Sequence, residues 1–254
     1  MRPNLLSGLM QAVRRNLYIG ETDIRLFEVG NRYLDEGKER TPKEERMLAM
    51  AIAGEGRLNW LEKRRATSFH DLKGTVEELM ARFGINAFSL EPATDSLFSS
   101  GEGLSVQVKG EAIGYYGSLS DRVRKVYDMD RSVFYAEFSL EKIAALAKKS
   151  RLMKEIPKFP SSPRDLTVIV QEDLKAECMI EQIRKLAGEL AAKVEVFDSF
   201  KGGQIPKGKK SLSLRIFYQA KDRTLQNEEV NNLHFSIIDA LNKSFGAELP
   251  KAKG

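Results

Sequence analysis

The order of strand and helix patterns beyond residue 163 constrains the fold more than any other feature of the sequence. Strand-like segments at residues 166–170, 194–200 and 211–218 are interleaved with amphipathic helical segments at residues 176–187 and 228–245. A short last strand at residues 248–249 would complete the order βαββαβ. Both helices can then cover one face of a four-stranded antiparallel sheet, which leaves the opposite face open. Proteins that bind RNA, sense metabolites or carry metals all use this fold, so the fold alone does not identify the function.

The segment at residues 211–218 indicates the chemistry of that open face. Its apolar side chains alternate with Ser211, Ser213, Arg215 and Phe217, so one side of the strand is apolar and the other carries hydroxyls, a guanidinium and a ring. Ser211 lies on the same side as Arg215 by this alternation. On the preceding strand, Asp198 and Phe200 are two residues apart and share a face, which we expect to be the exposed one. Such a surface suits a single-stranded nucleic acid, whose bases stack on aromatic rings.

The loop between these two strands is rich in glycine and lysine. Lys207, Lys209 and Lys210 are placed to contact phosphates. The run from Gly203 to Lys209 also matches most of a Walker-type phosphate loop. However, Lys210 stands where Ser or Thr would hold magnesium, and a strand follows where a helix would be needed. These two mismatches argue against binding of a nucleoside triphosphate here.

Composition excludes several other classes. The single cysteine, Cys178, rules out an intrachain disulfide and favours a reducing, cytoplasmic compartment. The two histidines, His70 and His234, offer little for a zinc site. We expect His70 to be structural and His234 to be half-buried or on the surface. No apolar run approaches the ~18 residues of a membrane span, so no membrane partner is expected. The net charge of +5 is compatible with RNA without requiring it.

The first 150 residues predict an antiparallel α+β domain. A helix is expected over residues 5–17, so close to the first residue that we expect the chain to begin part-way through a domain. A helix starting at a cap formed by Asp71 and ending at Phe83 is also predicted. The other predicted elements are strands at residues 24–34 and 47–53 around a charged loop (35–46), a strand at 87–90, a hairpin of 104–108 and 112–119, a strand at 133–138 and a helix at 140–148.

A run with three prolines, residues 154–163, marks the predicted boundary between two domains. The chain is therefore expected to comprise residues 1–153, this linker and residues 164–254.

Several motifs of the second domain occur in an order found in one known family. They are Arg164-Asp165-Leu166, Phe197-Asp198-x-Phe200-x-Gly202, Lys210-Ser211-Leu212 and Arg223-Thr224-Leu225. Together they resemble the ferredoxin-fold anticodon-binding domain of bacterial phenylalanyl-tRNA synthetase beta subunits. The first domain resembles the class II synthetase-like domain of the same subunits. Its matching motifs are Arg2-Pro3-Asn4-Leu5-Leu6-Ser7-Gly8-Leu9, Leu26-Phe27-Glu28-Val29-Gly30, Phe69-His70-Asp71-Leu72-Lys73-Gly74 and Gly114-x-x-Gly117. The resemblance covers essentially the whole chain.

This resemblance implies a part of phenylalanine–tRNA ligase, an alpha2-beta2 heterotetramer that uses ATP and magnesium. The first domain would pack against the catalytic alpha subunit and would itself be non-catalytic, with no cofactor. The sequence agrees with this loss of catalysis, because it lacks a Gly-Leu-Gly-x-Glu-Arg type of ATP-binding motif. Glu28 and Arg32 lie in the strand where a working enzyme would place its ATP-contacting pair, but no second arginine motif joins them. The family's upstream domains, which include an editing site and a magnesium-binding region, are expected to be missing from this chain.

The resemblance also implies that the second domain recognises the anticodon of phenylalanine tRNA. The expected tRNA-binding residues are Asp198, Phe200, Ser211, Arg215, Arg164, Lys207, Lys209 and Lys210. Asp198 would bond a base edge and Phe200 would stack on a base, whereas Arg164 could equally pair with Asp165 or Asp198.

Two departures from the family pattern affect this reading. Phe200 stands where the family usually has tyrosine, and the run from Ser99 to Gly103 replaces a His-Pro-Gly pattern in an expected loop. Two alternatives stay open. The first is a stand-alone regulatory or metabolite-binding module. The second is a free RNA chaperone, against which the mild charge counts.

Overall fold

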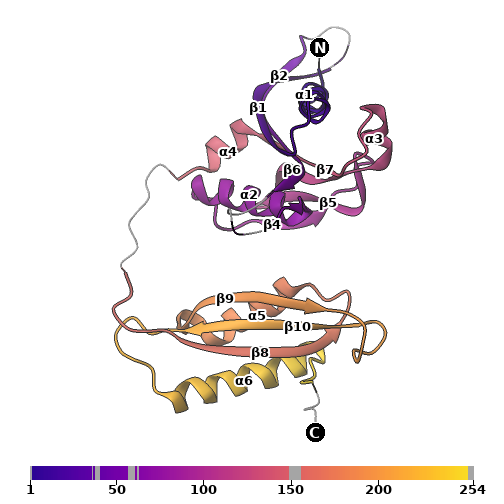
Figure 1. Ribbon diagram of the computed structural model, residues 1–254. Coiled ribbons are helices and arrows are strands. Elements are labelled where there is room, and N and C mark those ends of the chain that lie inside the picture. Colours follow the sequence, from indigo (N-terminus) through magenta and orange to yellow (C-terminus); the bar gives the residue numbers. More distant parts are fainter. Residues whose placement is uncertain are drawn as a thin grey trace. The chain divides into compact units, whose positions relative to one another are not determined.

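A computed structural model describes residues 2–35, 37, 41–56, 61, 63–148 and 156–250 of the chain. The chain divides into two compact units, Met1–Leu152 and Met153–Gly254 (Figure 1). Residues 154 and 155 of the predicted linker lie outside the described residues. Its last two residues, Ser162 and Pro163, already belong to the first strand of the C-terminal unit.

The N-terminal unit is built on one antiparallel sheet with the strand order β1-β2-β7-β6-β5-β4, in which a short β3 also pairs with β2. Its strands are β1 (Asp23–Leu34), β2 (Lys43–Gly56), β3 (Arg65–Ala66), β4 (Ser89–Pro92), β5 (Phe98–Val108), β6 (Glu111–Leu119) and β7 (Val133–Ser139). Its helices are α1 (Leu6–Tyr18), α2 (Phe69–Arg82), α3 (Asp121–Val126) and α4 (Leu140–Leu146). The predicted α+β class with an antiparallel sheet is confirmed.

Apolar side chains cover both faces of this sheet. On one face, Leu9 and Val13 of α1 belong to a core with Tyr135 of β7. On the other face, the core includes Leu72 of α2 and Phe138 of β7. Every residue of β7 is therefore buried, as expected for a strand that is covered on both sides.

Several predicted boundaries in this unit were wrong. The charged loop predicted at residues 35–46 is shorter, because β2 already begins at Lys43. The run from Ser99 to Gly103 lies within β5 instead of forming a loop, and α3 was not predicted. The hairpin around Lys109 and Gly110 is confirmed, and both residues have the positive φ that a tight type I′ turn requires.

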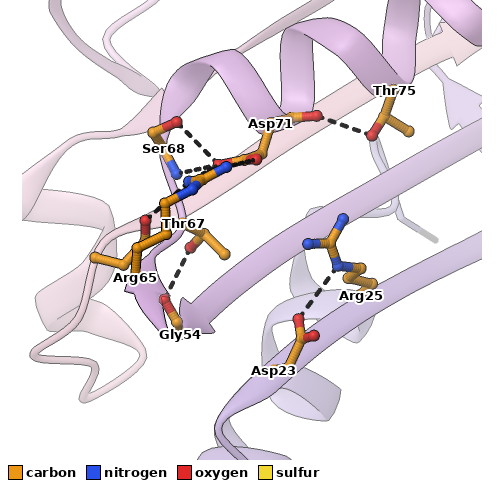
Figure 2. Close-up of polar contacts among 9 residues, drawn as sticks. Asp23, Arg25, Gly54, Arg65, Thr67, Ser68, Asp71 and Thr75 are labelled. Atoms are coloured by element: carbon orange, nitrogen blue, oxygen red, sulfur yellow. Dashed lines mark hydrogen bonds and ion pairs between the residues drawn. The ribbon is translucent and has the colours of Figure 1, made fainter. Parts of the chain in front are cut away.

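The start of α2 also differs from the prediction. The N-cap is Ser68, and Asp71 occupies the third helical position, where it completes a capping box (Figure 2). Asp71 accepts hydrogen bonds from the Ser68 N–H at 2.8 Å and from both terminal nitrogens of Arg65 at 2.8 and 2.6 Å. The Arg65 hydrogen bonds hold the pKa of Asp71 well below its ordinary value. Asp71 therefore stabilises the folded state at neutral pH, and this contribution is lost as the pH falls toward the lowered pKa.

The C-terminal unit contains the predicted order of strands and helices. Its elements are β8 (Ser162–Gln171), α5 (Ala176–Ala187), a 3-10 turn (Gly188–Leu190), β9 (Ala191–Phe200), β10 (Lys209–Tyr218) and α6 (Asn227–Phe245). The strands pair antiparallel in the order β8-β10-β9 and run side by side in Figure 1. The predicted last strand is reduced to a single bridge between Glu248 and Ile169 of β8.

The two helices of this unit cover one face of the sheet. Apolar side chains from alternate positions of β8 and β10, such as Val168 and Leu214, are buried in one core with Ile183 of α5 and Ile237 of α6. His234 was expected to be half-buried or on the surface, but it is buried, and its Nδ1 lies 3.1 Å from the hydroxyl of Tyr218. Burial lowers the pKa of His234, so the ring stays neutral at physiological pH.

Candidate nucleic-acid interface

The register of β9 and β10 brings four predicted residues to one face of the C-terminal sheet. Ser211 of β10 lies opposite Phe200 of β9, and Ser213 lies opposite Asp198. Because cross-strand partners point to the same side, these residues share the face that the helices leave open. Arg215 follows on the same face by alternation. The predicted common face of Asp198, Phe200, Ser211 and Arg215 is therefore present.

A β-bulge adds a residue that strict alternation would not place there. The pairing shifts between Ser213 and Leu214, so that Asp198 and Val196 have partners while Phe197 is the extra residue. The guanidinium carbon of Arg215 lies 5.2 Å from the centre of the Phe197 ring, which places Phe197 on the open face too. Its exposed fraction is 54%, close to the 53% of Phe200. The sequence alone does not place Phe197 on this face, because a bulge depends on the partner strand.

Arg215 is held in place by its neighbour on β8. Asp165 lies opposite Arg215 in the register and accepts hydrogen bonds from Nε at 2.6 Å and from Nη2 at 2.7 Å. These bonds keep the pKa of Asp165 below its ordinary value. The pair neutralises most of the charge of Arg215 and fixes the plane of its guanidinium.

A polar strip lies between the two phenylalanines. The hydroxyls of Thr167 and Ser213 are 2.9 Å apart and bond each other. Asp198 beside them is exposed, and within the described ranges its carboxylate has no protein hydrogen-bond partner. An ionised carboxylate only accepts hydrogen bonds, so Asp198 can receive the N–H groups of a ligand.

The three predicted lysines of the loop differ in availability. Lys209 forms an ion pair with Glu248 at 2.8 Å, and Lys210 donates to the carbonyl oxygen of Leu174 at 2.6 Å. Lys210 is partly buried, and this burial lowers its pKa. Among the residues that the structure describes, Lys207 is the exposed member of the three without an ion pair. The strand β10 begins at Lys209, directly after the loop, as the rejection of a Walker-type site required.

Arg164 stands apart from the other predicted residues. It lies on the helix side of β8 and donates to the side-chain oxygens of Asn231 at 3.1 Å and Asn227 at 3.2 Å, both on α6. Neither pairing considered from sequence, with Asp165 or with Asp198, is formed. Arg164 therefore does not join the open face.

The N-terminal unit has a polar recess of about 270 Å³, lined in part by Arg32, Glu45, Glu137 and Lys142. Arg32 and Glu28 were considered from the sequence as a candidate ATP-contacting pair, and Arg32 is bound to Glu45 at 2.6 Å. The other, Glu28, is bound to Arg2 at 2.5 Å, outside the recess. In the part of the chain that the structure describes, no cluster of three metal-ligating side chains occurs, and no helix is long and apolar enough to cross a membrane.

The order of strands and helices in the C-terminal unit, with both helices on one face of an antiparallel sheet, defines a ferredoxin-like fold. Residues 1–140 match the family model of the phenylalanyl-tRNA synthetase beta chain CLM domain, and residues 157–250 match that of the ferredoxin-fold anticodon-binding domain. The chain belongs to the phenylalanyl-tRNA synthetase beta chain family.

Two curated relatives agree with this assignment. The phenylalanine–tRNA ligase beta subunit of Geobacter metallireducens is 30% identical over 251 residues, which are 98% of this chain and 31% of that protein. The beta subunit of Bacillus cereus is 32% identical over 253 residues, 99% of this chain and 31% of that protein. The chain thus spans about a third of the length of these relatives. A pyrrolysyl-tRNA synthetase structure from Desulfitobacterium hafniense matches 57% of this chain and 49% of its own, with 18% identity and a TM-score of 0.44.

Proposed function

We propose that the open face of the C-terminal unit binds the anticodon of phenylalanine tRNA, as part of the beta subunit of phenylalanine–tRNA ligase. The observation that carries this proposal is the common exposed face of Asp198, Phe200, Ser211 and Arg215, in a domain that matches the anticodon-binding family model. Family membership over the whole chain favours this function over a stand-alone metabolite-binding module, the alternative that the fold alone permits.

Each residue of the face has a distinct role in this proposal. The ring of Phe200 stacks on an unpaired base, and every base has a π-face, so this contact adds affinity more than discrimination. Asp198 accepts hydrogen bonds and therefore selects a base edge that presents donors. Lys207 attracts the phosphate backbone. Lys209 and Lys210 contribute less, because Glu248 and the carbonyl oxygen of Leu174 already engage their amines.

The roles of Phe200 and Asp198 can be separated by RNA binding. Phe200→Ala is expected to cost about 1–3 kcal/mol of binding free energy for phenylalanine tRNA. Asp198→Ala is expected to reduce the preference for this tRNA over one with a replaced first anticodon base. The measurement is a titration of the chain with both tRNAs at one fixed salt concentration.

Phe235→Ala and Asp239→Ala are matched controls for this titration, because both change exposed side chains of the same types on α6, on the helix side. We expect both controls to bind as the unmodified protein does. If Phe200→Ala and Asp198→Ala leave affinity and preference unchanged, the open face is not the tRNA site.

We also propose that the N-terminal unit packs against the catalytic alpha subunit within an alpha2-beta2 enzyme. In this proposal the complete enzyme uses ATP and magnesium in the cytoplasm, and this chain carries no active site. Strand β1 supports the proposal, because it lies at the edge of the sheet and exposes Phe27 and Val29 by 73% and 43%. Two apolar side chains at alternate positions of an edge strand form a surface that a partner can cover.

Co-expression with the alpha subunit tests this interface. Phe27→Glu is expected to abolish or strongly weaken co-purification, because the new charge would be buried without a partner. Val126→Glu on α3 is the matched control, since it changes an apolar side chain that is 75% exposed elsewhere on the same unit. Equal recovery of the alpha subunit with both variants would place the interface away from β1.

A further inference from the structure

We propose that Phe197 is a second base-stacking ring, so that the open face holds two separate bases, one on Phe197 and one on Phe200. This inference rests on the proposed RNA-binding function and adds a residue that alternation along β9 would assign to the protein core.

The bulge gives Phe197 its position on the open face. Without it, the side chain would point to the same side as the core residues of β10. Instead the residue remains 54% exposed and does not belong to the apolar core of the C-terminal unit. Apart from its contact with the Arg215 guanidinium, this large apolar ring takes no part in the core and is available for a ligand.

Arg215 and Asp165 prepare this ring for stacking. The guanidinium of Arg215 lies over the Phe197 ring, and the two hydrogen bonds to Asp165 fix its orientation. Because Asp165 engages Nε and Nη2, Arg215 acts less as a phosphate ligand than as part of a flat surface. Bases stack on guanidinium planes as well as on aromatic rings, so the pair of Phe197 and Arg215 forms one stacking platform.

The distance between the Phe197 and Phe200 rings determines whether the face fits stacked bases or unstacked bases. Because Phe197 is the extra residue of the bulge, it is separated from Phe200 by two to three strand steps, about 7–10 Å. Neighbouring bases in a continuous stack are only about 3.4 Å apart. The two platforms therefore fit bases that are splayed apart, as in an unpaired loop, and not consecutive bases of a helix.

Binding of an RNA hairpin that carries the anticodon loop of phenylalanine tRNA tests the inference. Phe197→Ala should weaken binding by about 5-fold or more, whereas Phe197→Trp, which keeps a stacking ring, should bind as well as the unmodified chain or better. Phe235→Ala, which removes an exposed ring from α6, should change nothing. A fully paired duplex of the same sequence should show no difference between Phe197→Ala and the unmodified chain.

A fluorescent base analogue, 2-aminopurine, placed in turn at each loop position identifies the stacked bases, because stacking quenches its emission. We expect Phe197→Ala to restore emission at one position and Phe200→Ala to restore it at another. If Phe200→Ala weakens binding but Phe197→Ala does not, the second platform is refuted while the proposed function stands. If neither variant weakens binding, the proposed function fails as well.

Discussion

Replacing Glu137 with alanine is expected to lower the free energy of unfolding of the N-terminal unit by about 3–5 kcal/mol, because it leaves two buried donors and one partly buried donor without an acceptor. Glu137 is fully buried in β7. It accepts hydrogen bonds from the N–H of Leu5 at 3.2 Å and from the hydroxyls of Tyr115 at 2.7 Å and Tyr135 at 2.9 Å.

The two tyrosines remain donors throughout the neutral range. Burial and the adjacent carboxylate raise the pKa of Tyr115 and of Tyr135 above the ordinary value of a phenol. Since Leu5 immediately precedes α1, the same carboxylate also ties the start of this helix to the centre of the sheet.

Urea unfolding of the N-terminal unit measures this effect. Glu102→Ala is the matched control, because Glu102 is an exposed glutamate on β5 of the same sheet, and its loss should cost no more than about 0.5 kcal/mol. Tyr115→Phe, which removes one donor and leaves the acceptor, should cost about 1 kcal/mol. Equal midpoints for Glu137→Ala and Glu102→Ala would show that the buried carboxylate does not stabilise the sheet.

The C-terminal fold could be predicted because its signals are local. Helix and strand periods determine which side chains of an element share a face, and these periods follow from backbone geometry alone. The pair Asp198 and Phe200 was placed correctly for this reason. Phe197 was not, because its direction depends on a shift of register against Ser213 and Leu214 of another strand. The local pattern of apolar residues does not show which residue of β9 is the extra one.

Electrostatic partners were also beyond sequence analysis. Lys209 and Lys210 look like free phosphate ligands in a lysine-rich loop, yet Glu248 and the backbone of Leu174 engage them from distant parts of the chain.

Long-range contacts also override local composition in β5. The run from Ser99 to Gly103 looks like a loop, but Gly103 pairs with Gly117 of β6. The missing side chain at Gly117 matters there, because a Cβ would lie only 2.4 Å from the carbonyl oxygen of Glu102.

A double-mutant cycle on the two rings is expected to give the largest loss of RNA affinity. If Phe197 and Phe200 hold separate bases, each alanine substitution removes one stacking contact of about 1–3 kcal/mol, and the double variant loses about 2–6 kcal/mol. Residues about 10 Å apart without a shared partner usually add within about 0.5 kcal/mol. Strong coupling would instead mean that both rings contact the same base.

The cycle requires the dissociation constants of four proteins for one anticodon-loop hairpin, measured over a series of salt concentrations. Removing the rings should lower affinity without changing the salt dependence, since a stacked base releases no counterions. Lys207→Ala should show the opposite pattern, a slope reduced by about 0.7 with little change in base preference. A double ring variant that binds no more weakly than Phe200→Ala alone would remove Phe197 from the interface. The face would then have a single stacking platform.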